Sequence, residues 1–140
     1  MTHSQKIFEL TAPYNNQYQG NYTRLLFVCT VGMLRSPTAA EVGYQFGYNC
    51  RSCGWDEVAL IRLSANLIAW ADHIIFMNPE AKIESIKLFN NTGYEEDIEQ
   101  KSMVMHLEDD YNFGDGILRC IVENWIRLMH DTHKLSPTRK

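Results

Sequence analysis

Runs of hydrophobic residues separated by polar turns divide most of the chain into alternating short strands and helices. Residues 25–29 form a continuously apolar run, which is typical of a strand buried on both faces. Residues 73–77 have the same character, 49–53 are a more modest strand candidate, and 102–107 are the last one. The pattern therefore predicts four strands.

Helices are predicted between and after these strands. Ser36 followed by Pro37 is typical of an N-cap and a first helical residue, and predicts a helix to about Gly47. Further helices are expected from Ser64 to Asp72, from Pro79 to the turn at 90–93, and near the C-terminus. The apolar positions of the last two are Ile83, Ile86, Leu88 and Phe89, and then Ile117, Leu118, Ile121, Val122, Trp125, Ile126, Leu128 and Met129.

Alternation of strands and helices predicts an α/β fold built from right-handed βαβ units. We expect a single domain over residues 24–140, with a four-stranded parallel sheet covered by helices on both faces in a Rossmann-like three-layer arrangement. Residues 1–23 mix tyrosine with asparagine and glutamine without a sustained period, which predicts an N-terminal arm. Ligands of such sheets bind at the carboxyl ends of the strands, where Cys29 and Asp109 are expected.

Composition narrows the possible functions. The chain has 140 residues, of which 45% are hydrophobic, enough for one core. Its net charge of -4 argues against a nucleic-acid partner. No apolar stretch approaches the roughly 20 residues that cross a membrane, and residues 1–6 are too polar for a signal peptide. We therefore expect a cytoplasmic protein without a membrane partner, whose cysteines are reduced; these are Cys29, Cys50, Cys53 and Cys120.

Candidate chemistry lies in residues 29–36. Cys29 ends a buried strand, and Arg35 follows six residues later at a helix start. A strand, a short loop and a capped helix together place backbone N–H groups around an anion, and arginine adds a planar fork for two phosphate oxygens. The same surroundings favour the thiolate of Cys29, and Gly32 permits a positive φ in the loop. The alternative is a buried strand-end cysteine and an unrelated surface arginine.

Residues 25–29 together with 35–41 resemble the signature of the low-molecular-weight protein tyrosine phosphatases. The similarity continues through 51–54, 63–77 and 107–111 into the C-terminal helix, so that it covers about residues 25–129. It implies a hydrolase that needs neither metal nor cofactor and acts on a phosphorylated protein or a small phosphomonoester, releasing inorganic phosphate.

The resemblance also assigns roles to residues. Cys29 would attack phosphorus and form a cysteinyl-phosphate, Arg35 would hold the phosphoryl oxygens, and Asp109 would protonate the leaving oxygen as general acid. Ser36 would either stabilise the thiolate or only cap the helix. Trp55 could form a wall for an aromatic substrate or be packing. The expected substrate-binding residues are Thr30, Val31, Gly32, Met33, Leu34, Ser36 and Tyr111.

Three departures from the family pattern leave other functions open. Gly32 replaces the usual asparagine, Leu34 a cysteine of some members, and Asp110 the proline of an Asp-Pro-Tyr sequence. One alternative is therefore a catalytically weak, phosphate-binding regulatory protein. Another is an arsenate reductase, which would need Cys50 or Cys53 as a relay thiol.

Histidines and cysteines also raise the question of a metal. A zinc site from Cys50, Cys53, His130 and His133 is disfavoured, because both histidines are expected on the surface of a helix end. His73 and His106 flank buried strands and are expected to be structural. The prediction is that the protein has no metal site.

Overall fold

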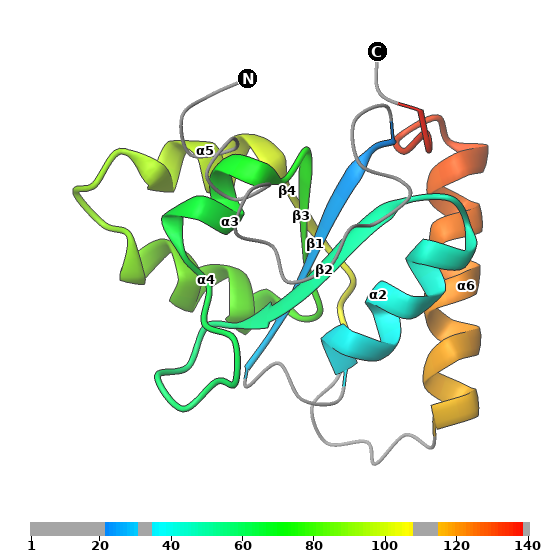
Figure 1. Ribbon diagram of the computed structural model, residues 1–140, viewed down its shortest axis with the longest axis horizontal. Helices are drawn as coiled ribbons and strands as arrows, with labels where there is room; N and C mark the ends of the chain where they lie inside the picture. The colour runs from blue at the N-terminus through cyan, green and yellow to red at the C-terminus, as the bar shows by residue number, and fades with distance from the viewer. Residues whose placement is uncertain (1–21, 31–34, 108–114, 139–140) are drawn as a thin grey trace.

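The computed structural model describes residues 22–30, 35–107 and 115–138, and within them a three-layer α/β domain (Figure 1). Its four strands form one parallel sheet, as predicted, and their order is β2-β1-β3-β4. The strands are β1 (Arg24–Cys29), β2 (Asn49–Gly54), β3 (His73–Phe76) and β4 (Ser102–Val104). The helices are α2 (Arg35–Gln45), α3 (Ala65–Trp70), α4 (Pro79–Leu88), α5 (Tyr94–Lys101) and α6 (Asp115–Asp131).

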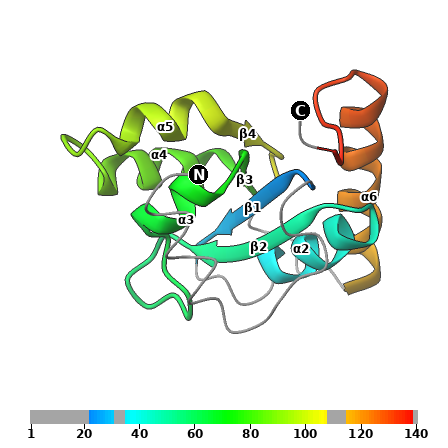
Figure 2. The same ribbon diagram turned by 45° about the horizontal axis from the view of Figure 1, so that its top comes forward.

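Helices cover both faces of the sheet. Figure 2 shows α2 and α6 on one face and α3, α4 and α5 on the other. The chain moves outward from β1 to β2 and then back across β1 to β3. Because parallel crossovers keep one handedness, this reversal of direction places the first connecting helix and the later ones on opposite faces.

The central strand β1 supplies both hydrophobic cores. Its side chains alternate between the faces of the sheet, as the strand period requires. Leu25, Phe27 and Cys29 belong to the core beneath α2 and α6, whereas Leu26 and Val28 belong to the core beneath α3, α4 and α5. Both faces are covered, so the strand has to be apolar at every one of these positions.

Two of the predicted helix starts are confirmed by their caps. The Ser64 hydroxyl accepts a hydrogen bond from the Leu67 amide at 3.3 Å, before α3. The Asn78 side chain accepts one from the Ala81 amide at 2.8 Å, with Pro79 as the first residue of α4. These side chains satisfy amide groups that have no partner within the helix.

The last strand is shorter than predicted. It ends at Val104 rather than at 107, although the Met105 and Leu107 amides still donate to the Phe76 and Met77 carbonyls, at 2.9 and 2.8 Å. His106 between them has a φ of 56°, a left-handed conformation that breaks the extended backbone. The prediction was therefore wrong in extent because His106 breaks the extended conformation of the strand.

The apolar pattern also overstated the buried faces of two helices. Ile83 and Leu88 of α4 are exposed, as are Ile117 and Leu128 of α6. The core contacts of α6 come from Leu118, Val122, Ile126 and Met129. Helix α5 was not predicted, because its sequence is almost entirely polar and only Ile98 is buried.

The beginning of β1 is held by the C-terminal tail. The Thr23 amide donates to the Pro137 carbonyl at 2.7 Å, and Tyr22 bridges to Thr138. Thr23, which was expected in the arm, is thus buried at the edge of the domain. Residues 1–21 of the expected arm lie outside the described residues. In the described part of the chain, no helix has the length and apolar character to cross a membrane.

Candidate active site

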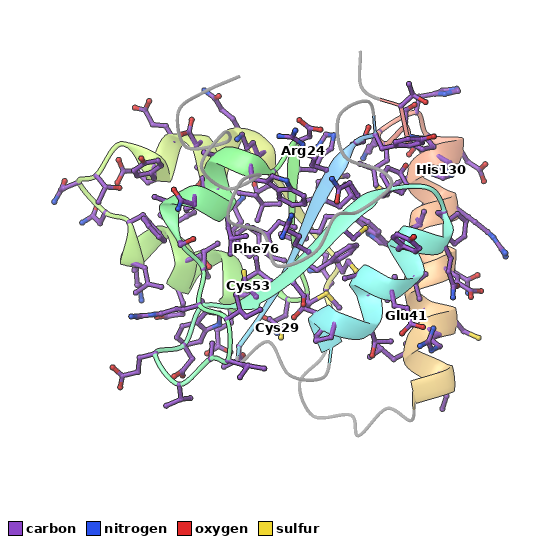
Figure 3. All side chains as sticks on the ribbon, viewed as in Figure 1. Arg24, Cys29, Glu41, Cys53, Phe76 and His130 are labelled. Carbon is purple, nitrogen blue, oxygen red and sulfur yellow. The ribbon has the colours of Figure 1, made fainter. Side chains whose placement is uncertain are left out.

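Cys29 ends β1 at the place where the strand order reverses. The two neighbours of β1, which are β2 and β3, are connected through helices on opposite faces. In open parallel sheets a crevice forms at such a point, outside the carboxyl ends of the strands. Figure 3 shows Cys29 at this end of β1 and Arg24 at the other. The side chain of Cys29 is 5% exposed.

The hydroxyl group of Ser36 contacts the thiol. Its Oγ lies 3.1 Å from Cys29 Sγ, and Ser36 is fully buried. The same Oγ lies 3.3 Å from the Cys53 carbonyl, to which it donates. Since a serine hydroxyl has one proton, it can donate either to a Cys29 thiolate or to this carbonyl.

Ser36 was predicted as the N-cap of the helix with Pro37 as its first residue, which puts the start of the helix two residues too late. Helix α2 begins at Arg35, so Ser36 lies inside its first turn. Its hydroxyl contacts the Cys29 thiol and the Cys53 carbonyl of β2 instead of serving as the N-cap.

The start of α2 provides a positive electrostatic potential near Cys29. The first amide groups of a helix have no internal acceptor, and the helix dipole is positive at this end. No acidic residue lies in the first turn of α2 to compensate it. The local arrangement therefore favours an anion, either the thiolate or a phosphoryl group, beside the end of β1.

Two contacts that the sequence did not predict join β1 to the segment after β2. The Trp55 amide donates to the Cys29 carbonyl at 3.1 Å, and the Asp56 amide donates to the Thr30 carbonyl at 2.9 Å. They continue the β1–β2 ladder beyond Gly54. The continuation fixes the backbone at Cys29 and brings Trp55 next to the site.

Several of the predicted site residues lie outside the described residues. These are Val31, Gly32, Met33, Leu34, Asp109 and Tyr111. The backbone of Arg35 is placed at the first residue of α2. The structure thus brings together Cys29, Thr30 and Ser36, while the roles of the other residues remain predictions.

The remaining cysteines differ sharply from Cys29 in their surroundings. Cys53 packs in the core on the opposite face of the sheet. Burial raises the pKa of the Cys53 thiol, and a charge on Cys29 would raise it further; burial also raises the pKa of Cys50. Both thiols therefore stay protonated, which makes them poor attacking groups in a disulfide relay. Cys120 is exposed on α6.

His130 was expected to be a free surface residue, and the structure shows that it is not. It is hydrogen-bonded to the Tyr48 hydroxyl and stacks on the Tyr48 ring with centroids 5.7 Å apart. Burial, with a smaller contribution from Cys50, raises the pKa of Tyr48, so that its hydroxyl keeps its proton. Among the residues that the structure describes, no cluster of three histidine, cysteine or acidic side chains could hold a metal ion.

Comparison with known proteins shows which fold family this chain shares. No protein-family profile and no curated protein matches the chain. Solved structures do match: the YwlE arginine phosphatase from Geobacillus stearothermophilus has a TM-score of 0.61 at 19% identity, covering 80% of this chain and 93% of that one. The tyrosine phosphatase Wzb from Escherichia coli K30, in complex with phosphate, has a TM-score of 0.60 at 14% identity, covering 82% and 99%.

A third match is a low-molecular-weight protein tyrosine phosphatase from Bacillus subtilis, with a TM-score of 0.58 at 16% identity, covering 79% and 99%. The chain has the fold of the low-molecular-weight protein tyrosine phosphatases. The expected fold is confirmed over the length of these proteins. In the low-molecular-weight phosphatase fold of this chain, Cys29 is at the carboxyl end of the central strand.

Proposed function

We propose that this protein is a phosphomonoester hydrolase that acts through a cysteinyl-phosphate, with phosphotyrosine in a protein as the substrate. The observation that carries the proposal is the position of Cys29. It ends the central strand at the switch point, beside the first turn of α2, with the Ser36 hydroxyl 3.1 Å from its sulfur. The similarity of the fold to arginine and tyrosine phosphatases supports it.

The first step transfers the phosphoryl group to the enzyme. The Cys29 thiolate attacks phosphorus, an S–P bond forms, and the bond from phosphorus to the leaving oxygen breaks. Asp109 gives its proton to that oxygen. Backbone N–H groups at the start of α2 and the Arg35 guanidinium neutralise the charge on the phosphoryl oxygens.

The second step restores the enzyme. Water attacks phosphorus, the ionised Asp109 takes its proton, and the S–P bond breaks to release inorganic phosphate and the thiolate. The Ser36 hydroxyl donates to the sulfur whenever it carries negative charge. Two displacements on one cysteine replace one difficult displacement by water.

Hydrolysis of p-nitrophenyl phosphate by the purified protein tests the proposal. We expect turnover by the wild type and its complete loss in Cys29→Ser, because serine has similar volume but is not ionised near neutral pH. Arg35→Lys should also lose activity, since lysine keeps the charge without the bidentate fork. Vanadate should inhibit competitively. Turnover that persists in Cys29→Ser would exclude the covalent mechanism.

Further assays separate the alternatives. Phosphotyrosine and phosphoarginine peptides of one sequence decide which phosphorylated residue is preferred. Arsenate-dependent oxidation of thiols identifies a reductase, and binding of phosphate without any turnover identifies a regulatory protein. A chelator should leave phosphatase activity unchanged, and loss of activity would contradict a mechanism without metal.

A further inference from the structure

In the described part of the chain three residues other than glycine have a positive φ, and one of them is not at a helix end. Asn91, with a φ of 63°, follows α4, and His133, with a φ of 58°, follows α6; a left-handed residue commonly ends a helix in this way. His106, with a φ of 56°, instead follows the edge strand β4. Away from helix ends, such residues gather at functional sites.

The hydrogen bonds on either side of His106 show how its conformation changes the strand. The Met105 amide donates to the Phe76 carbonyl at 2.9 Å, and the Leu107 amide donates to the Met77 carbonyl at 2.8 Å. In a regular parallel ladder, donors two residues apart bond to acceptors two residues apart, whereas Phe76 and Met77 are neighbours. The β4 side therefore has one extra residue. Such a β-bulge changes the direction of the chain and is frequent next to active sites.

The two neighbours of His106 hold the bulge in place. Met105 is 8% exposed and Leu107 6% exposed, and both belong to the core beneath α2 and α6, together with Cys29. The His106 side chain between them is exposed. The anchored neighbours thus fix the backbone of His106, and its imidazole is not part of the core.

The bulge lies level with the candidate nucleophile. The Met77 amide donates to the Val28 carbonyl at 2.9 Å, so Met77 alone separates Leu107 from the end of β1. Two strand spacings of about 4.8 Å each amount to roughly 10 Å between Leu107 and β1. Asp109 follows two residues later, and two residues span at most about 7 Å. The side chain of Asp109 can therefore reach a phosphoryl group on Cys29 only if the chain turns toward β1 after β4.

We infer that His106 is a positioning residue for the general acid. Its left-handed backbone turns the chain toward β1, so that Asp109 reaches the phosphoryl group on Cys29, and its imidazole takes no part in the reaction. The inference rests on the proposed function, in which Asp109 protonates the leaving oxygen. Asp109 itself lies outside the described residues, and Met105, His106 and Leu107 form the described stem of the segment that carries it.

Phenyl phosphate and p-nitrophenyl phosphate test the positioning, because phenol is the poorer leaving group and depends more on the donated proton. The readout is the ratio of kcat/KM for the two esters, which does not respond to a loss of folded protein. His106→Val should lower kcat/KM for phenyl phosphate by about 10-fold or more relative to p-nitrophenyl phosphate, since a β-branched residue disfavours the left-handed region. His106→Gly and His106→Asn adopt that region readily and should keep the wild-type ratio.

His133→Val is the matched control, because it replaces the same side chain in the same backbone conformation at the end of α6. It should lower stability and leave the ratio unchanged. In an Asp109→Asn background, His106→Val should not change the ratio further, since both substitutions remove the same proton transfer. His106→Ala makes the same test with less steric strain, should His106→Val fail to fold.

Three results would overturn the positioning role alone, provided that the wild type hydrolyses both esters. The first is a wild-type ratio in both His106→Val and His106→Ala, and the second is an equal change of the ratio in His133→Val. The third is a change in His106→Asn as large as that in His106→Val, because the imidazole would then be the group required. No hydrolysis of either ester by the wild type would refute the proposed function, and the positioning role with it.

Discussion

At the scale of single residues, the proton of Ser36 connects the nucleophile to the sheet. When Cys29 is a thiol, the serine donates to the Cys53 carbonyl, and Cys29 donates to the serine oxygen. When Cys29 is a thiolate, it has no proton to donate, and the serine proton turns to the sulfur. The hydroxyl therefore stabilises the charged form without a change in the backbone.

Ser36→Ala should weaken the nucleophile. A hydrogen bond to a charged group contributes about 1.5–3 kcal/mol, so we expect turnover to fall by about 10-fold or more. Alkylation of Cys29 by iodoacetamide should shift to higher pH. Ser64→Ala is a suitable control, because Ser64 caps α3 and affects only stability. An unchanged alkylation profile in Ser36→Ala would show that the contact with sulfur is only packing.

The identity of the general acid can also be tested at the scale of single residues. Glu108, Asp109 and Asp110 are consecutive, and the family register selects Asp109, two residues before Tyr111. Asp109→Asn should lower turnover of phosphotyrosine by about 10²–10⁴, and that of p-nitrophenyl phosphate much less, because a good leaving group needs no proton. Asp110→Asn should be nearly silent. Kinetics of both variants on both substrates decide which aspartate is the general acid. A larger loss of turnover in Asp110→Asn would show that the general acid is Asp110.

At the scale of elements, the close approach of α2 to β2 depends on Gly43. A Cβ atom at this position would lie 2.6 Å from Cys50 Sγ and 3.4 Å from the Phe27 ring. Helices usually gain stability when glycine is replaced by alanine. Here the contact with Cys50 opposes that gain.

Gly43→Ala should therefore destabilise the protein, by about 1–3 kcal/mol as expected for an overpacked core. In a Cys50→Ala background the same substitution should be neutral or stabilising. Gly116→Ala is the control, because among the residues that the structure describes no packing partner lies within 4 Å of a Cβ atom there. Urea denaturation of the four proteins of this cycle measures the coupling, and an equal loss in both backgrounds would contradict the explanation.

Strands and helices that are marked by apolar runs or capping residues could be predicted from the sequence. Elements whose conformation depends on their surroundings in the fold could not. The strands β1 and β3 and the starts of α3 and α4 follow from apolar runs and capping residues. Helix α5 has one buried side chain, so no periodic signal marks it. The end of β4 depends on the φ of His106, which sequence does not reveal.

At the scale of the whole molecule, the same distinction applies to the candidate site. The position of Cys29 at the carboxyl end of a strand could be predicted from the apolar run 25–29 and the alternation of strands and helices, whereas the strand order comes from the structure. The contacts with Trp55 and Asp56 depend on how far the β1–β2 ladder continues, and the Ser36 contact depends on where α2 begins. Such details come from packing between distant segments rather than from local pattern.

The two ends of the sheet carry different titratable side chains. Cys29 lies at the carboxyl end of β1, whereas His73 starts β3 and pairs with Leu25 at the opposite end. There a depression of about 320 Å³ contains Asp72, His73 and residues of the C-terminal tail. Titration at this end should affect folding without affecting the chemistry at Cys29.

Stability should accordingly fall with acidification through His73. Burial lowers the pKa of His73 in the folded protein, although Asp72 opposes the shift. The unfolded state therefore binds the proton more readily, so the stabilising contribution is complete above the unfolded value of about 6.5 and is lost as pH falls below it. His73→Gln should flatten the dependence of the unfolding free energy on pH between about 7 and 5. Urea denaturation across this range measures it, and the pH profile of p-nitrophenyl phosphate hydrolysis should remain the same in the variant. A parallel change in both profiles would show that the two ends of the sheet are coupled.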